Sequence, residues 1–246
     1  MKENKYDDNI FFQKYSQMSR SQQGLAGAGE WETLRKLLPD LKDKRVLDLG
    51  CGYGWHCIYA MEHGASSVVG VDISHKMLEV AKEKTHFPQV EYKCCAIEDV
   101  EFPEESFDVI LSSLAFHYVA DYEILVKKIY RILKSGGKLV FTVEHPVFTA
   151  YGTQDWYYNE KGEILHFPVD NYYYEGKRTA VFLGEKVTKY HRTLTTYLNT
   201  LLSNGFIINH IVEPQPPEYM MDIPGMQDEM RRPMMLIVSA NKKVDR

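Results

Sequence analysis

Val46-Leu47-Asp48-Leu49-Gly50-Cys51-Gly52-Tyr53-Gly54 is the stretch that decides the fold. A hydrophobic strand runs directly into three glycines at alternate positions, and a helical pattern follows from Trp55. Glycine suits a backbone that must turn sharply and approach a ligand with no Cβ in the way. A helix that begins just after such a turn presents free N–H groups and the positive end of its dipole. The stretch therefore predicts a strand–turn–helix unit with a nucleotide-like ligand at the turn.

Strands and helices alternate on both sides of this turn as far as residue 145. The expected strands are residues 45–49, 67–71, 90–94, 107–112 and 138–143. The expected helices are residues 31–38, 55–63, 76–84 and 122–133, with Ser74 as the N-cap of the third. A further helix over 193–203 and strands over 206–212 and 234–241 end the chain. This alternation is typical of a parallel sheet with helices on both faces.

The pattern changes after Pro146. Residues 146–188 are rich in Tyr, Trp and Gly and show no sustained helical period. A long irregular segment inside a compact domain is uncommon and often functional, so we expect a lid, with residues 151–174 as a substrate cover. The chain is then one domain over 1–246. Its parts are an N-terminal helical segment (1–44), a core (45–145), a lid-like insertion (146–191) and a C-terminal helix with strands (192–246).

Composition limits the partners that the chain is expected to have. The net charge of −5 gives no general electrostatic reason to bind nucleic acid or an anionic membrane. The sequence has no run of 18 apolar residues, and residues 1–15 lack the apolar centre of a signal peptide. The four cysteines have neither zinc-site nor disulfide spacing, so we expect no metal and reduced thiols in a cytoplasm.

An acidic residue after the second strand narrows the choice of ligand. Asp72 lies 22 residues past Gly50, where open α/β sheets typically place an acceptor for ribose hydroxyls. A dinucleotide turn has the pattern G-x-G-x-x-G, whose third glycine allows close helix packing. Here Trp55 stands at that position and the last glycine comes one residue early, at Gly54. An NAD(P)-dependent oxidoreductase is therefore the less favoured alternative.

Four motifs resemble those of the class I S-adenosylmethionine-dependent methyltransferases. They are Asp48–Gly54, Val69-Gly70-Val71-Asp72-Ile73-Ser74, Phe102-Pro103-Glu104-Glu105-Ser106-Phe107-Asp108 and Leu133-Lys134-Ser135-Gly136-Gly137. They arrive in the family's order, and the resemblance covers roughly residues 15–145. It implies an α/β fold: a Rossmann-like, doubly wound, seven-stranded and mostly parallel sheet with an antiparallel last strand. It also implies an enzyme that uses S-adenosylmethionine as cofactor and methyl donor.

The resemblance further implies which residues hold the cofactor. The turn passes beneath its methionine part and ribose, Asp72 holds the ribose hydroxyls and Ile73 packs against the adenine. The implied set is Asp48, Gly50, Cys51, Gly52, Gly54, Asp72, Ile73, Ala96, Ile97, Ser113 and Leu114, with Tyr15 and Arg20 closing over the carboxylate. Many members carry an acidic residue where this chain has Ala96. The adenine amino group must therefore be bound here by backbone, by Glu98 or by water.

Methyl transfer is an in-line displacement, so alignment of the acceptor supplies most of the catalysis. A base helps only when the acceptor atom is protonated. His117 and His145, which follow the fourth and fifth strands, are the candidate bases because imidazole titrates near neutral pH. His117 is equally well explained as a polar loop residue. Glu144 precedes His145, but neighbours on a strand point to opposite faces, and a structural role for one of them is as well supported.

Basic residues near the same rim suggest a clamp for a carboxylate or phosphate on the substrate. The arginines of this clamp are Arg192, Arg231 and Arg232, and Tyr190 and His191, which precede Arg192, are further candidate substrate contacts. The alternative is an ordinary arginine pair that neutralises Asp228 and Glu229. We therefore expect a methyltransferase that acts on an oxygen or nitrogen atom of a small molecule. A non-catalytic module that only binds S-adenosylmethionine is the alternative from a different class.

Overall fold

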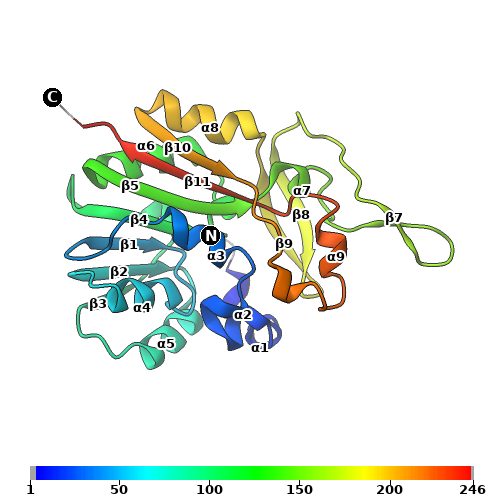
Figure 1. Cartoon of the computed structure of the whole chain (residues 1–246), viewed down its shortest axis with the longest axis horizontal. Helices are drawn as coiled ribbons and strands as arrows, with labels where there is room; N and C mark the ends of the chain where they lie inside the picture. The colour runs from blue at the N-terminus through cyan, green and yellow to red at the C-terminus, as the bar shows by residue number, and fades with distance from the viewer. Residues whose placement is uncertain (1–3, 245–246) are drawn as a thin grey trace.

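The main sheet has seven strands in the order β10-β11-β5-β4-β1-β2-β3 (Figure 1). The computed structural model describes residues 4–244. The strands are β1 (Arg45–Leu49), β2 (Ser67–Asp72), β3 (Val90–Cys94), β4 (Phe107–Ser113), β5 (Leu133–Glu144), β10 (Phe206–Val212) and β11 (Met235–Lys242). Strand β11 is antiparallel to both of its neighbours, and the other pairs are parallel. The predicted fold class is confirmed, and the fifth strand begins earlier than expected.

Helices cover both faces of this sheet. They are α3 (Trp31–Leu34), α4 (Trp55–Glu62), α5 (His75–Lys84), α6 (Tyr122–Ile132) and α8 (Leu194–Ser203). Side chains of α6 and α8 share one buried cluster with Leu47 and Leu49, whereas those of α3, α4 and α5 share another with Val46. Consecutive residues of β1 thus face opposite layers. Because β1 is buried on both faces, its residues 46–49 are all apolar apart from Asp48.

The parallel register brings several strand ends to one edge of the sheet. Leu49 is level with Val71, so the turn after β1 and Asp72 at the end of β2 lie side by side. Ser113 pairs with Thr142, which places the end of β4 close to the end of β5. Ligands of open α/β sheets bind beyond this carboxyl edge.

The N-terminal segment crosses the same edge. It contains η1 (Lys5–Asp7), α1 (Asn9–Ser16), α2 (Ser19–Gln22) and η2 (Gly24–Gly27). The Asp7 carboxylate accepts hydrogen bonds from Ser74 Oγ at 2.6 Å and from the Lys76 backbone N–H at 3.1 Å. Ser74 is also the N-cap of α5, as the sequence predicts. The segment is therefore fastened to the residues that directly follow Asp72.

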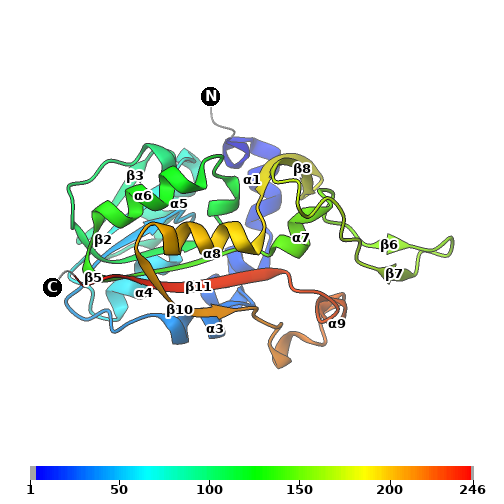
Figure 2. The same ribbon diagram turned by 90° about the horizontal axis from the view of Figure 1, so that it is seen from above.

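The insertion is more regular than its sequence predicts. It contains the helix α7 (Pro146–Ala150) and two antiparallel hairpins, β6 (Tyr157–Tyr158) with β7 (Ile164–His166) and β8 (Gly176–Phe182) with β9 (Glu185–His191). The β8–β9 hairpin packs on α1 through Ala180, Val187 and Phe11. The β6–β7 hairpin projects from the body of the protein as an arm (Figures 1 and 2).

Short helices complete the fold. The predicted helix over 31–38 divides into α3 and the 3-10 helix η3 (Arg35–Leu37), and the segment before β11 contains η6 (Glu218–Met220) and α9 (Met226–Glu229). Within residues 4–244, no helix is both long and apolar enough to cross a bilayer.

Candidate active site

A cavity of about 600 Å³ lies at the carboxyl edge of the sheet. The ends of four core strands contribute Gly50, Asp72, Ser113 and Glu144 to its lining. The N-terminal segment and the β8–β9 hairpin supply further walls, and the loops after β3 and β4 and the start of β11 complete the lining. One cavity therefore connects the glycine turn to the insertion.

Two backbone hydrogen bonds fix the glycine turn. The N–H groups of Gly50 and Cys51 both donate to the carbonyl of Val71, at 2.8 and 3.0 Å. The three glycines of the turn have φ values of +81°, +52° and +75°, a region that L side chains rarely adopt. The turn is thus held against the end of β2 in a conformation that favours glycine.

The three glycines are needed for different reasons. A Cβ on Gly50 would lie 2.4 Å from Ala115 Cβ, and one on Gly54 would lie 2.2 Å from Tyr92 Oη. Both positions therefore allow close packing of the protein against itself, and Gly54 is absent from the cavity lining. A Cβ on Gly52 would meet nothing within 4 Å. Gly52 is the glycine that faces open space in the cavity.

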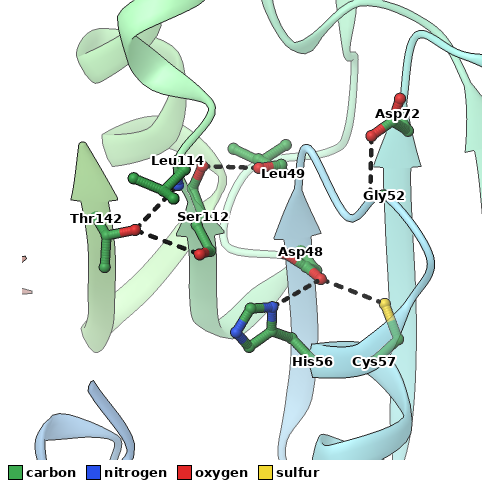
Figure 3. Close-up of polar contacts among 10 residues, drawn as sticks. Asp48, Leu49, Gly52, His56, Cys57, Asp72, Ser112, Leu114 and Thr142 are labelled. Atoms are coloured by element: carbon green, nitrogen blue, oxygen red, sulfur yellow. Dashed lines mark hydrogen bonds and ion pairs between the residues drawn. The ribbon is translucent and has the colours of Figure 1, made fainter. Parts of the chain in front are cut away.

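Asp72 is held in a fixed orientation beside Gly52. Its Oδ2 accepts a hydrogen bond from the Gly52 backbone N–H at 2.9 Å (Figure 3). Its Oδ1 accepts one from the Ser74 backbone N–H, also at 2.9 Å. Burial raises the pKa of Asp72, and these two hydrogen bonds oppose that rise. Each oxygen keeps a further lone pair, which suits a carboxylate that accepts hydrogen bonds from a ligand.

The end of β4 is strained where it meets the cavity. Leu114 has a φ of +54°, and its N–H donates to Thr142 Oγ1 at 3.0 Å (Figure 3). The same N–H also donates to the Thr142 carbonyl at 3.0 Å. A left-handed conformation at a non-glycine residue costs about 1–2 kcal/mol and is typical of functional sites. Ser113 and Leu114 both line the cavity.

The expected adenine wall also borders the cavity. Ile73, Ala96, Ile97 and Glu98 line it together with Met77. Tyr15 and Arg20 approach from the N-terminal segment and line the opposite side of the turn. The Arg20 guanidinium donates to Glu30, which lies just before α3.

Asp48 lies behind the turn and not in the cavity. Its Oδ2 is 3.6 Å from Cys57 Sγ and 4.0 Å from His56 Nδ1 (Figure 3). Burial raises the pKa of Asp48 to about 7 and lowers that of His56 to about 4. Neither Asp48 nor Gly54 lines the cavity, so the structure does not support the direct contact with the cofactor that was expected for each. Cys51 is buried beneath the turn and borders only a small side chamber.

His117 lines the far end of the cavity as a hydrogen-bond donor. Its Nδ1 accepts from the Glu144 backbone N–H at 3.3 Å, which leaves the proton of the neutral ring on Nε2. Burial lowers the pKa of His117 to about 4, so the ring is neutral at physiological pH. A protonated Nε2 gives a hydrogen bond to an acceptor molecule and takes no proton from it.

A buried ion pair that the sequence analysis missed lies beside His117. Lys189 Nζ is 2.5 Å from Glu144 Oε1 and 2.8 Å from Gln154 Oε1, and Gln154 Nε2 donates to Glu144 Oε2 at 2.6 Å. Glu144 and Lys189 both line the cavity. The position of Glu144 at a strand end was a usable signal. Nothing in the sequence pairs it with Lys189, which lies 45 residues away.

His145 is not placed in the cavity. Its Nδ1 accepts from the Val147 backbone N–H at 3.1 Å as the N-cap of α7, and its Nε2 lies 2.8 Å from Glu213. Nδ1 is thus occupied by the helix cap, the Nε2 contact with Glu213 is close but lacks hydrogen-bond geometry, and His145 does not line the cavity. The structure therefore gives no support to the expected catalytic base at His145.

Of the five expected substrate contacts, the structure brings Tyr190 to the cavity. His191 is fully buried between Thr149 Oγ1 at 2.7 Å and the Tyr172 carbonyl at 2.9 Å. Arg192 donates to the carbonyls of Val119 and Ala120 and packs against aromatic rings. These two residues hold the base of the insertion in place.

The arginine clamp is also not supported. Arg231 pairs with Asp228 at 3.0 Å, and Arg232 pairs with Glu229 at 2.7 Å. Arg232 is buried, and its guanidinium lies 4.5–4.9 Å from the ring centroids of Phe148, Trp156 and Phe167. The alternative reading, a pair that neutralises the two carboxylates of α9, is what the structure shows.

Comparisons with known proteins agree with this geometry. The family described as a methyltransferase domain matches residues 47–141. A crystal structure assigned to the S-adenosylmethionine dependent methyltransferases, from Listeria monocytogenes, is 58% identical, covers 89% of this chain and 99% of its own, and has a TM-score of 0.86. An S-adenosylmethionine dependent methyltransferase from Mesorhizobium loti is 41% identical over 89% of this chain and 100% of its own, with a TM-score of 0.82.

A more distant relative is an enzyme of ubiquinone biosynthesis. A ubiquinone biosynthesis O-methyltransferase from Coxiella burnetii is 36% identical over 113 residues, which cover 45% of this chain and 48% of that protein. The match thus spans about half the length of that relative.

Proposed function

The chain belongs to the class I S-adenosylmethionine-dependent methyltransferases, and we propose that it methylates an oxygen or nitrogen atom of a small molecule. One observation carries the proposal: a single cavity runs from Gly52 and Asp72 to His117 and Glu144. Its volume of about 600 Å³ suits a nucleoside-sized cofactor together with a small acceptor. The O-methyltransferase from Coxiella burnetii supports a small acceptor of this kind.

The end of the cavity beside the glycine turn fits the cofactor. Open space above Gly52 accommodates a ligand where any other residue would place a Cβ. Asp72, aligned by two backbone N–H groups, accepts hydrogen bonds from the ribose hydroxyls. Ile73 and Ile97 provide apolar surface for the adenine, and Ser113 and Leu114 border the methionine part.

The end of the cavity beside His117 and Glu144 receives the acceptor. When bound, the cofactor supplies an electrophilic methyl group on a sulfonium. His117 donates from Nε2 to an oxygen of the acceptor, and the apolar side chains of Phe182, Met234 and Met235 exclude water. Alignment in a dry pocket is what an in-line displacement requires most.

Glu144 orients an acceptor that carries a proton. Lys189 and Gln154 hold its carboxylate. Burial raises the pKa of Glu144, but the charge of Lys189 and the hydrogen bonds from Lys189 and Gln154 outweigh it, so the pKa is lowered. An ionised carboxylate accepts more than one hydrogen bond per oxygen. It therefore fixes an acceptor hydroxyl or amino group with its lone pair free to attack.

An acceptor screen tests the proposal. Purified protein with S-adenosylmethionine is offered a panel of phenols, catechols, amines and carboxylic acids, and formation of S-adenosylhomocysteine is followed. We expect turnover with small acceptors and loss of turnover in Asp72→Asn, whereas Asp170→Asn, exposed on the insertion, behaves as wild type. Turnover only with a protein or nucleic-acid acceptor would contradict the proposal.

A further inference from the structure

A small side chamber of about 70 Å³ opens beside the main cavity. Tyr15, Arg20 and Gly52 line both spaces, so the chamber continues the cavity past the glycine turn. Glu30 and Trp55 line only the chamber. The cofactor placement proposed above directs its methionine part toward this end.

The chamber wall contains a buried ion pair. The Arg20 guanidinium donates to Glu30 Oε1, and the two side chains are 22% and 2% exposed. The second carboxylate oxygen of Glu30 is buried and has no hydrogen-bond partner among residues 4–244. A buried ion pair is a poor source of stability, and a buried oxygen without a donor costs free energy. A ligand that brings a donor would remove that cost.

The surrounding groups add no net charge. Burial keeps His56 neutral at physiological pH, with a pKa of about 4. The Trp55 Nε1 donor is also buried without a partner in the described part of the chain. The chamber therefore presents one cation, one anion and an unused neutral donor, which together complement a zwitterion.

We propose that Glu30 binds the ammonium group of the cofactor's amino-acid end, beside Arg20, to which the family resemblance already assigns the carboxylate. This inference rests on the cofactor placement proposed above, and it adds Glu30 as a specificity-determining residue. The pair makes the enzyme select S-adenosylmethionine and S-adenosylhomocysteine over adenosine thioethers that lack the amino acid. A zwitterion is matched by paired opposite charges, because each charge of the ligand then meets its opposite.

Calorimetry with two ligands tests the pair. S-adenosylhomocysteine carries the amino acid, and 5′-methylthioadenosine has the same adenosine and sulfur without it. We expect Glu30→Gln to weaken S-adenosylhomocysteine binding about 10- to 100-fold, the usual loss of a charged hydrogen bond, and to leave 5′-methylthioadenosine within about twofold. Glu32→Gln is the matched control, because Glu32 pairs with Arg35 on the exposed side of the same segment.

The alternative outcomes are distinct. A parallel loss for both ligands would mean that the pair only supports the N-terminal segment, and unchanged S-adenosylhomocysteine affinity would remove Glu30 from the site. Failure of wild type to bind either ligand would overturn the cofactor placement as well. If Glu30→Gln does not fold, the wild-type protein is titrated with an S-adenosylhomocysteine analogue that lacks only the amino group. An affinity equal to that of the parent compound would contradict the proposal.

Discussion

Replacing Gly52 with alanine should separate ligand binding from folding. Gly52 has a φ of +52°, and its added methyl group would meet no protein atom within 4 Å. The cost to the fold is then the left-handed backbone alone, about 1–2 kcal/mol in the free energy of unfolding. The methyl group would occupy the space proposed for the cofactor. We expect the affinity for S-adenosylhomocysteine to fall at least about 100-fold, or roughly 2.7 kcal/mol.

The neighbouring glycines provide matched controls in the same turn. Gly50→Ala would place its Cβ 2.4 Å from Ala115 Cβ, and Gly54→Ala would place its Cβ 2.2 Å from Tyr92 Oη. Each adds an overpacking cost of about 1–3 kcal/mol to the backbone cost. The second changes Ala115→Gly and Tyr92→Phe remove the clashing atoms and should restore part of the lost stability.

Two measurements compare the three glycine-to-alanine variants with the wild type. Urea denaturation gives the free energy of unfolding of each variant, and calorimetry with S-adenosylhomocysteine gives its affinity. Wild-type affinity in Gly52→Ala would refute the placement of the cofactor at this turn. A loss of stability in Gly52→Ala equal to that in Gly54→Ala would show that the space above Gly52 is not open.

Three further variants test expected site residues that the structure places outside the cavity lining. Asp48→Asn should be more stable than wild type by up to about 4 kcal/mol at pH 8 and equal to it near pH 4. The folded-state pKa of Asp48 is raised from 3.8 to about 7, so its contribution is present below pH 4 and lost as the pH rises through 7; a pH-independent difference in urea titrations would contradict this. His145→Ala should lower the free energy of unfolding by about 1 kcal/mol through loss of the α7 cap and keep full methyl transfer; a large fall in turnover at unchanged stability would return His145 to the catalytic residues. Arg232→Met should cost about 3 kcal/mol because it leaves Glu229 without its partner, whereas S-adenosylhomocysteine affinity stays unchanged; weaker binding in calorimetry would argue for a role at the site.

The sequence predicts the core because its signals are local. Strands β1, β2 and β4 are short and mostly apolar, and each ends in a turn. Parallel pairing brings those ends together whatever the helices contain. Gly50, Asp72 and Ser113 are therefore correctly expected at one rim. The β8–β9 hairpin gives no such signal. Its inward face contains Lys189 and His191, which are buried because of partners far away in the chain, so no apolar period is visible.

Charged residues are the other reason why predictions from the sequence differ from the structure. Arg192 and Arg232 are correctly expected beyond the carboxyl edge, but a sequence does not say which group satisfies a guanidinium. Backbone carbonyls satisfy Arg192, and a carboxylate with three aromatic rings satisfies Arg232. Both guanidinium groups therefore already have partners within the protein. The role proposed for Glu30 has no signal in the sequence, because Glu30 precedes a short helix in a segment without a motif.

The proposed cofactor end and the proposed acceptor end of the cavity are built differently. The cofactor end is formed largely by residues that follow β1, β2 and β4, each aligned by backbone hydrogen bonds within the sheet. The acceptor end depends on Lys189 of the insertion, whose ammonium group is held by Glu144 of β5. Removing one partner of such a buried pair is strongly destabilising, so the position of the insertion is fixed relative to the core. Changes elsewhere in the hairpin can then alter the acceptor pocket while the cofactor end stays intact.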